Sequence, residues 1–213
     1  MFKKKFNASL KRGFIMNIRT GIFKKIFLLI LVSLNSGFLV AEVKNVILMI
    51  GDGMSLAVID FSRITLVGKD GYLNFEKFPV VGIVKTYSYN SLVTDSAAAA
   101  TAMSSGVKTK NSYLGTTPDK QNVVHIIELA KKKGKSVGLV TTVTITHATP
   151  AGFAIHTTSR DELSVAEQYA EFKNVDVLMG GGEYYFVPQN VKGSKRKDDR
   201  NLLEEFISSG YKV

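Results

Sequence analysis

The stretch Val46-Ile47-Leu48-Met49-Ile50 is followed at once by Gly51-Asp52-Gly53. An unbroken apolar run, rather than an alternating one, predicts a strand that is buried on both faces, as in a parallel sheet. The glycines on either side of Asp52 allow the chain to turn sharply where this strand ends. We therefore expect Asp52 at the carboxyl edge of a parallel sheet, where open α/β sheets bind their ligands.

The segments that follow alternate between strand and helix patterns. We expect strands at residues 79–86, 136–142 and 175–179, and helices at residues 55–67, 96–105, 122–133 and 201–209, with two more helical segments around residues 157–160. Such alternation predicts an α/β fold, a three-layer sandwich with a mostly parallel central sheet between helices. No internal repeat or linker interrupts residues 42–213, so we expect them to belong to one domain.

The net charge of +10 is concentrated near the N-terminus. Residues 1–41 contain eight basic side chains and no acidic ones, so the other 20 basic and 18 acidic residues carry only +2. A nearly neutral body is a poor electrostatic footprint for nucleic acid, and we expect no nucleic-acid partner. The sequence contains no cysteine, which excludes disulfides, thiolate metal sites and a cysteine nucleophile.

Residues 1–41 have the pattern of an N-terminal extension with a secretory signal peptide. Lys24-Lys25 precede an apolar run over residues 26–34, and Ala41 is a small residue suited to cleavage. The run is shorter than the ~20 residues that span a membrane, so an uncleaved anchor is the less favoured alternative. We expect a periplasmic or extracellular protein after cleavage near Ala41. Met1 and Met16 are both candidates for the start of translation.

Polar side chains follow several of the expected strands and should meet at one edge of the sheet. Asp95-Ser96 opens an alanine-rich helix, and a hydroxyl at a helix N-terminus lies beside N–H groups that attract phosphate or another oxyanion. Asp52 suits a hard metal ion, and the planar guanidinium of Arg160 suits phosphate oxygens. His147 and Thr149 add an imidazole and a hydroxyl. Singly, each residue has an equally good structural explanation, but together they predict a phosphate-processing site.

The order of four short motifs resembles the alkaline phosphatase family. They are Gly51-Asp52-Gly53-Met54, Val93-Thr94-Asp95-Ser96 with the small residues after it, His147-Ala148-Thr149-Pro150-Ala151, and Arg160. Residues 105–109 and the segment 176–182 with its triple glycine match as well, so the resemblance covers nearly all of residues 43–213. It implies that family's fold and the hydrolysis of phosphate monoesters through a covalent phosphoserine, with two zinc ions and one magnesium ion.

The resemblance also assigns the residues that act on phosphate. Ser96 resembles the nucleophile, which a zinc ion activates, and Arg160 resembles the arginine that clamps the phosphate oxygens. Asp95 is expected to orient Arg160. His125 and His156 match no motif and are expected to be structural.

The metal ligands that the resemblance implies are Asp52, Thr149 and His147. Asp52 resembles the carboxylate that bridges zinc and magnesium, and Thr149 resembles a magnesium ligand. His147 occupies a position that is aspartate in some members and histidine in others, where it supports magnesium mainly through water. The family's other zinc ligands lie in its later half, so we expect an N-terminal portion of a longer enzyme, with weak metal binding and impaired activity. The complete family enzyme is expected to be a homodimer that converts phosphomonoesters to inorganic phosphate.

Two other functions fit parts of the pattern. A sulfatase shares the broader fold and the edge aspartate, but its nucleophile is followed two residues later by proline, whereas Ser96 is followed by Ala97-Ala98. An esterase-type serine hydrolase would need glycines two residues before and after the serine, and Ser96 lacks both. The non-enzyme alternative is an exported remnant without a catalytic role, or a fragment that needs a complementary chain.

Overall fold

The computed structural model describes residues 43–213, so the expected signal peptide lies outside the described residues. The chain divides into two units between Ile50 and Gly51. The described part of the first unit, residues 43–50, is extended and contains no helix or strand. The second unit, residues 51–213, contains every helix and strand that the structure describes. Within the described range, no helix is long and apolar enough to cross a membrane.

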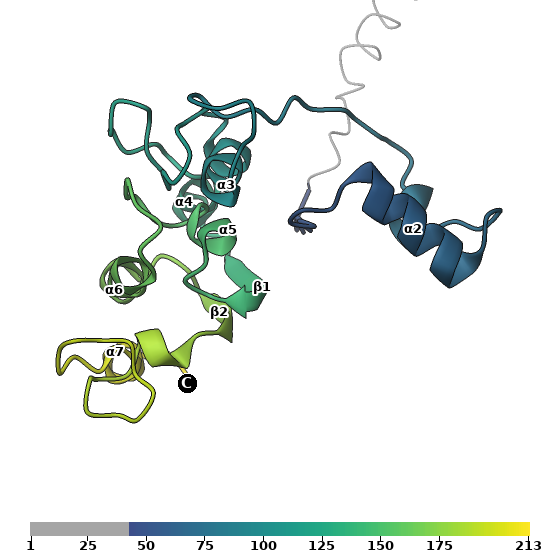
Figure 1. The fold of residues 1–213 in the computed structure, drawn as a ribbon. Helices are drawn as coiled ribbons and strands as arrows, with labels where there is room; N and C mark the ends of the chain where they lie inside the picture. Colours follow the sequence, from purple (N-terminus) through teal and green to yellow (C-terminus); the bar gives the residue numbers. More distant parts are fainter. Residues whose placement is uncertain (1–42) are drawn as a thin grey trace, which may run out of the picture. The chain divides into compact units, whose positions relative to one another are not determined.

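The second unit is a mixed α/β structure with helices and one short parallel sheet (Figure 1). The helices are α2 (Leu56–Val67), α3 (Ser96–Ser105), α4 (Ile126–Lys132), α5 (Ala148–Ala151), α6 (Glu162–Phe172) and α7 (Leu202–Ser208), with 3-10 turns η1 (Asn74–Lys77) and η2 (Glu183–Tyr185). The strands β1 (Gly138–Thr144) and β2 (Val177–Gly181) pair in parallel, and α5 and α6 lie between them in the chain. The predicted α/β class with a parallel sheet is confirmed.

The triple glycine at the end of β2 has a packing reason. The two strands pair from Gly138 opposite Val177 to Thr144 opposite Gly181, and the register is irregular between Val140 and Thr144. A Cβ atom added at Gly180 would lie 2.8 Å from a side-chain carbon of β1 and 3.1 Å from its backbone. Only glycine allows β2 to pass this irregular part of β1 so closely.

Two of the predicted strands are wrong for this structure. Residues 46–50 and 79–86 form neither helix nor strand. Ile47 is 87% exposed and Ile83 is completely exposed, which is the opposite of the burial that their apolar runs predict. A strand needs a neighbour for its N–H and C=O groups, and the described residues form one two-stranded sheet, made of β1 and β2. The apolar runs indicate segments suited to a sheet, but they do not supply the neighbour.

The predicted helices are found, with one boundary error of four residues. α4 begins at Ile126 rather than residue 122, because His125 is its N-cap and the residues before it are extended. Among the apolar residues of this segment, Val123 and Ile127 are buried, whereas Ile126 and Leu129 are 54% and 50% exposed. The two remaining strands each begin and end about two residues later than predicted.

The core of the second unit is built from the helices α3, α5 and α6 and the residues that connect them. The members from α3 and α5 are small: Ala97, Ala100, Ala148 and Ala151. The larger members are Ile155, between α5 and α6, Val165 and Tyr169 of α6, Phe186, which follows η2, and Leu202, which opens α7. A Cβ atom added at Gly152 would lie only 2.5 Å from Ala100 Cβ, so α3 and α5 approach each other closely. This packing holds the N-terminal ends of the two helices in one region of the unit.

We predict that burial of His125 makes the fold sensitive to acid. Burial, and secondarily the neighbouring His156, lowers the pKa of His125 from 6.5 to about 4. Between these pH values the unfolded chain binds a proton that the folded chain does not, so the free energy of unfolding falls as pH falls from 6.5 towards 4. The expected loss is roughly 2–4 kcal/mol. Urea unfolding of the wild type and of His125→Asn at several pH values measures it. If the free energies of unfolding of the two proteins differ by the same amount from pH 7 to pH 4, this prediction is contradicted.

Candidate active site

Ser96 is the first residue of α3. Residues 97–100 are all alanine, the residue with the highest helix propensity, so the helix forms directly after its N-cap, Asp95. The Asp95 carboxylate accepts a hydrogen bond from Ala98 N–H at 2.9 Å, and Gly106, with a φ of 75°, ends the helix. The half-buried Ser96 side chain therefore lies at the positive end of the helix dipole.

Asp52 lies in a tight turn. Met54 N–H donates to the Gly51 carbonyl oxygen at 3.2 Å, and Gly53 has a φ of 68°, which favours glycine over any other residue. The sequence therefore predicts this turn correctly, although the strand expected before it is not formed. The turn leaves the Asp52 side chain exposed and free to accept hydrogen bonds from hydroxyl groups.

The Asp52 carboxylate joins the hydroxyls of Ser96 and Thr149. Its Oδ2 atom accepts a hydrogen bond from Ser96 Oγ at 2.9 Å and another from Thr149 Oγ1 at 2.9 Å. These two bonds, to Ser96 first and then to Thr149, hold the pKa of Asp52 below its usual value; burial opposes them, and the nearby His147 and Arg160 side chains lower the pKa further. Asp52 is therefore ionised at neutral pH and acts as an acceptor and as a ligand for a cation.

Thr149 and His147 come from the connection between β1 and α5. His147 is the N-cap of α5, and Thr149 lies within its single turn. The connection is fixed from the other side by Glu162, because its Oε2 atom accepts hydrogen bonds from Thr144 Oγ1 and Thr146 Oγ1, each at 2.5 Å. The first residue of α6 thus holds the loop that carries two of the predicted metal ligands.

Arg160 comes from the connection between α5 and α6, which a two-bond bridge between Leu114 and Thr157 holds in place. Its Nη1 lies 3.3 Å from Asp95 Oδ2, so the predicted pairing of Asp95 with Arg160 is present. Its Nη2 lies 3.4 Å from His147 Nε2. The guanidinium can only donate, so this contact places a donor beside the His147 ring. Within the described residues, the other ring nitrogen, the buried Nδ1, has no hydrogen-bond partner.

The structure brings the five predicted site residues into one cluster. Asp52, Ser96 and Thr149 are joined directly by hydrogen bonds. Arg160 and His147 contact each other, and Arg160 reaches the start of α3 through its ion pair with the N-cap of that helix. The cluster therefore combines a hydroxyl, a carboxylate and a guanidinium, but the catalytic and metal-binding roles of these residues remain predictions.

Sequence reasoning missed the residues that support Asp95. Residues 107–121 are polar, with Gly115 and Pro118, a composition typical of a surface loop, but Asn111 folds back onto the start of α3. Its Oδ1 accepts a hydrogen bond from Asp95 N–H at 3.1 Å, and its Nδ2 donates to the Val93 carbonyl oxygen at 3.0 Å. Ser112, with a φ of 70°, donates its N–H to Asp95 Oδ2 at 2.8 Å. The one sequence signal was the pair Asn-Ser in a polar loop, which is typical of turns in general.

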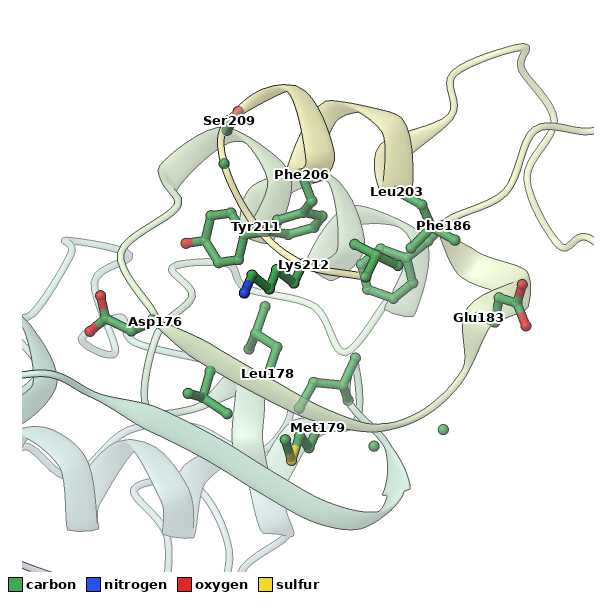
Figure 2. Close-up of a pocket in the computed structure, with 16 residues that line it drawn as sticks. Asp176, Leu178, Met179, Glu183, Phe186, Leu203, Phe206, Ser209, Tyr211 and Lys212 are labelled. Atoms are coloured by element: carbon green, nitrogen blue, oxygen red, sulfur yellow. The ribbon is translucent and has the colours of Figure 1, made fainter.

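A pocket of about 820 Å³ lies elsewhere in the second unit and contains none of these residues. Figure 2 shows it along β2, with Leu178 and Met179 on one side and Phe206 and Tyr211 on the other. The charged side chains of Asp176 and Glu183 lie at its two ends, and no serine hydroxyl is paired with a carboxylate there. Its apolar lining is typical of a packing surface, and we place the candidate active site at Asp52 and Ser96 instead.

The cluster fits magnesium better than zinc. Mg²⁺ prefers oxygen ligands, and Asp52 and Thr149 present a carboxylate and a hydroxyl oxygen 2.9 Å apart. Zn²⁺ takes about four ligands, drawn from cysteine, histidine and acidic side chains. Over residues 43–213 no group of three or more such side chains is arranged to hold a metal ion. The described residues therefore present two oxygen ligands of the kind that Mg²⁺ prefers, and they do not by themselves fit a zinc site.

A serine hydroxyl at a helix N-terminus, with a carboxylate and a guanidinium beside it on an α/β fold, is an arrangement that suits an oxyanion and that hydrolases use. The sequence profile of the family described as "Alkaline phosphatase" matches residues 43–213. The chain belongs to the alkaline phosphatase family.

Individual relatives agree with this assignment. The chain is 39% identical over 186 residues to alkaline phosphatase 4 of Bacillus subtilis, covering 80% of this chain and 38% of that protein. It is 34% identical to alkaline phosphatase of Gadus morhua, covering 78% of this chain and 44% of that protein. The chain thus spans less than half the length of these curated relatives.

Solved structures give the same result for the fold. Alkaline phosphatase from the Antarctic bacterium TAB5 matches with a TM-score of 0.62 and 35% identity, over 71% of this chain and 42% of that one. Alkaline phosphatase of Thermus thermophilus matches with a TM-score of 0.63 and 39% identity, over 74% and 32%. A substituted form of the TAB5 enzyme is described with Mg bound.

Proposed function

We propose that this protein hydrolyses phosphate monoesters and that Ser96 accepts the phosphoryl group. The observation that carries the proposal is the Ser96 hydroxyl at the N-terminus of α3, held 2.9 Å from the ionised Asp52 carboxylate. Membership of the alkaline phosphatase family supports phosphomonoester hydrolase activity. A dianionic phosphate also suits the charge of this site, which combines the helix dipole with the Arg160 guanidinium.

The reaction proceeds in two displacements at phosphorus. In the first, Ser96 Oγ forms a bond to phosphorus and the bond from phosphorus to the ester oxygen breaks. The proton that Ser96 loses balances the proton that the leaving alkoxide gains. In the second, water attacks the phosphoserine, releases inorganic phosphate and restores the Ser96 hydroxyl. Because its pKa is lowered, Asp52 is a weak base, so it orients the hydroxyl rather than retaining the proton.

Asp52 and Thr149 would hold a magnesium ion, and His147 lies at the same loop. When bound, such an ion supplies positive charge that offsets the charge of the phosphate oxygens. The chain's own contribution is to keep the Asp52 carboxylate ionised and to fix the loop that carries Thr149 through Glu162.

Arg160 orients the phosphate group. Its guanidinium has donors in a planar fork that matches two phosphate oxygens. The ion pair with Asp95 holds one nitrogen at 3.3 Å, and Asp95 is itself fixed by two backbone N–H groups, those of Ala98 and Ser112. Since Arg160 is about one-third exposed, it remains accessible to a substrate from solvent.

The cation ligands among the described residues set an upper limit on turnover. One carboxylate and one hydroxyl bind a divalent cation weakly, and the described residues offer zinc fewer ligands than its sites use. We therefore propose that this polypeptide transfers a phosphoryl group to Ser96 but completes the cycle slowly.

The test is the time course of 4-nitrophenyl phosphate hydrolysis by the purified chain with excess Mg²⁺ and Zn²⁺. We expect a burst of up to about one equivalent of 4-nitrophenol per chain, followed by a slow phase. The sulfate ester, 4-nitrophenyl sulfate, serves as the control and should give no burst. No burst with the phosphate ester, or an equal burst with the sulfate, would overturn the proposed function. Rapid, zinc-dependent steady-state turnover would overturn the proposed slow cycle alone.

A further inference from the structure

A buried polar cluster at the other end of α3 takes no part in the proposed reaction. Ser104, in the last turn of α3, is 3% exposed, and His125, the N-cap of α4, is fully buried. The Ser104 hydroxyl lies 2.9 Å from His125 Nδ1 and 2.6 Å from the carbonyl oxygen of Gly152, the C-cap of α5. One serine side chain therefore connects α3, α4 and α5.

The direction of these hydrogen bonds follows from their chemistry. The Gly152 carbonyl oxygen only accepts and makes the shortest contact, so the Ser104 proton is assigned to that bond, and the His125 ring proton is assigned to Nδ1, from which it donates to the Ser104 oxygen. The other ring nitrogen of His125, Nε2, lies farther from its neighbour, 3.3 Å from the Ile155 carbonyl oxygen. The bond from His125 to Ser104 is thus a direct link between the N-cap of α4 and the last turn of α3.

A second histidine supports the ring of His125 from its face. His156 stacks on His125 with a centroid distance of 4.7 Å and an interplanar angle of 26°. The nitrogens of His156 lie 2.7 Å from the Gly115 carbonyl oxygen and 3.1 Å from Glu128 Oε1. A Cβ atom added at Gly115 would lie 2.5 Å from His125 Nε2, so the backbone also closes against the ring. The His125 ring has little freedom to move away from Ser104.

The buried side chains of α3 and α5 are all small or short. They are Ala97, Ala98, Ala100, Thr101 and Ser104 in α3 and Ala148, Pro150 and Ala151 in α5, and a Cβ atom added at Gly152 would lie 2.5 Å from Ala100 Cβ. Small residues allow a close approach, but they offer few ridges that would interlock with the neighbouring helix. Directed hydrogen bonds are then needed to set the register, and Ser104 supplies them at one end of the interface.

The opposite ends of these helices carry the two hydroxyls that donate to Asp52. Ser96 opens α3 and Thr149 lies in α5, and both donate to the same oxygen of Asp52 at 2.9 Å. Because one oxygen receives both bonds, sliding α3 along α5 by about 1 Å breaks one of them. The register that Ser104 sets therefore determines whether Ser96 and Thr149 reach Asp52 together.

We propose that His125 and Ser104 are positioning residues, which fix α3 against α5 and so hold Ser96 and Thr149 at their common acceptor. That these residues fix α3 against α5 is inferred from the distances above. That they affect phosphate binding rests on the proposed function of Ser96. Neither residue touches a substrate, so both act through the helices.

The test compares amide hydrogen exchange in residues 96–103 and 148–153 among four variants of the chain. Ser104→Ala and His125→Leu should each raise the exchange rate of both segments by about 10-fold, because a buried hydrogen bond is lost. Ser105→Ala is the matched control, since the Ser105 side chain accepts only from Val107 N–H and donates within α3. His125→Asn can still donate to Ser104 and should recover most of the protection.

The comparison of asparagine with leucine separates positioning from packing. Leucine fills more of the space of the ring than asparagine but cannot donate. Equal amide exchange rates in His125→Leu and His125→Asn would overturn the proposal. Equal rates in Ser104→Ala and Ser105→Ala would overturn it as well. Should Ser104→Ala fail to fold, the two His125 variants decide the result by themselves.

Phosphate binding links the positioning to the site. The dissociation constant of inorganic phosphate, measured by ³¹P NMR in the same variants, should rise about 10-fold in Ser104→Ala and stay unchanged in Ser105→Ala. An equal constant in both variants would overturn the effect on the site. A wild-type chain that binds no phosphate would contradict the proposed function, and the exchange rates would still decide the positioning.

Discussion

Ser96→Ala is expected to abolish transfer of a phosphoryl group to the protein. The variant keeps the helix, because alanine favours α3 and the N-cap Asp95 is untouched, but it removes the oxygen that attacks phosphorus. Loss of a nucleophile reduces the rate by on the order of 10³-fold or more. The burst of 4-nitrophenol from 4-nitrophenyl phosphate measures the effect.

Ser105→Ala is the control for this prediction. It makes the same substitution in the same helix, at a hydroxyl that donates to the Thr101 carbonyl oxygen at 2.6 Å. This variant should keep the full burst. A burst of normal size in Ser96→Ala would exclude Ser96 as the nucleophile.

Arg160→Ala is expected to weaken the binding of inorganic phosphate by about 10- to 100-fold. The guanidinium contributes charge-assisted hydrogen bonds, each worth ~1.5–3 kcal/mol to a charged partner. Arg160→Lys should recover part of the affinity, because an ammonium keeps the charge but not the planar fork. The measurement is the phosphate dissociation constant by calorimetry.

Arg200→Ala controls for the loss of one positive charge. Arg200 pairs with Glu205 at 3.0 Å, away from the five residues of the site cluster, so its replacement should leave phosphate affinity within about 2-fold. Equal weakening in Arg160→Ala and Arg200→Ala would show that net charge, and not a local clamp, holds phosphate.

The elements that could be predicted from the sequence are those whose signals are local. α3 lies at residues 96–105 as predicted, because its alanine run and Gly106 act within a few residues of the helix. The paired strands β1 and β2 were found within about two residues for the same reason. The prediction of strands at residues 46–50 and 79–86 was wrong. A strand depends on a distant neighbouring strand, and an apolar run does not specify one.

The candidate site shows the same division between local and distant information. Asp52, Ser96 and Thr149 could be singled out because each follows an expected strand or opens an expected helix, and Arg160 because its guanidinium suits phosphate, and the structure brings them together. Their supporting residues escaped notice. Asn111 reaches Asp95 across 16 residues of sequence, in a segment whose composition is typical of any surface loop.

The predicted start of α4 was wrong because a tertiary contact competes with the local helix propensity. The apolar pattern before Ile126 suits a helix, but His125 is drawn to Ser104 and becomes the N-cap of a shorter one. Burial of a polar ring between three helices cannot be read from an apolar pattern. This burial can be recognised only once the structure shows which residues surround the His125 ring.

The most direct test of the central claim is to locate the phosphoryl group on the protein. The purified chain is mixed with 4-nitrophenyl phosphate, Mg²⁺ and Zn²⁺, quenched in acid, digested and sequenced by tandem mass spectrometry. Our account predicts phosphoserine at Ser96, at the start of α3, and none in Ser96→Ala. A phosphoryl group on another residue, or none on the wild-type chain, would contradict it.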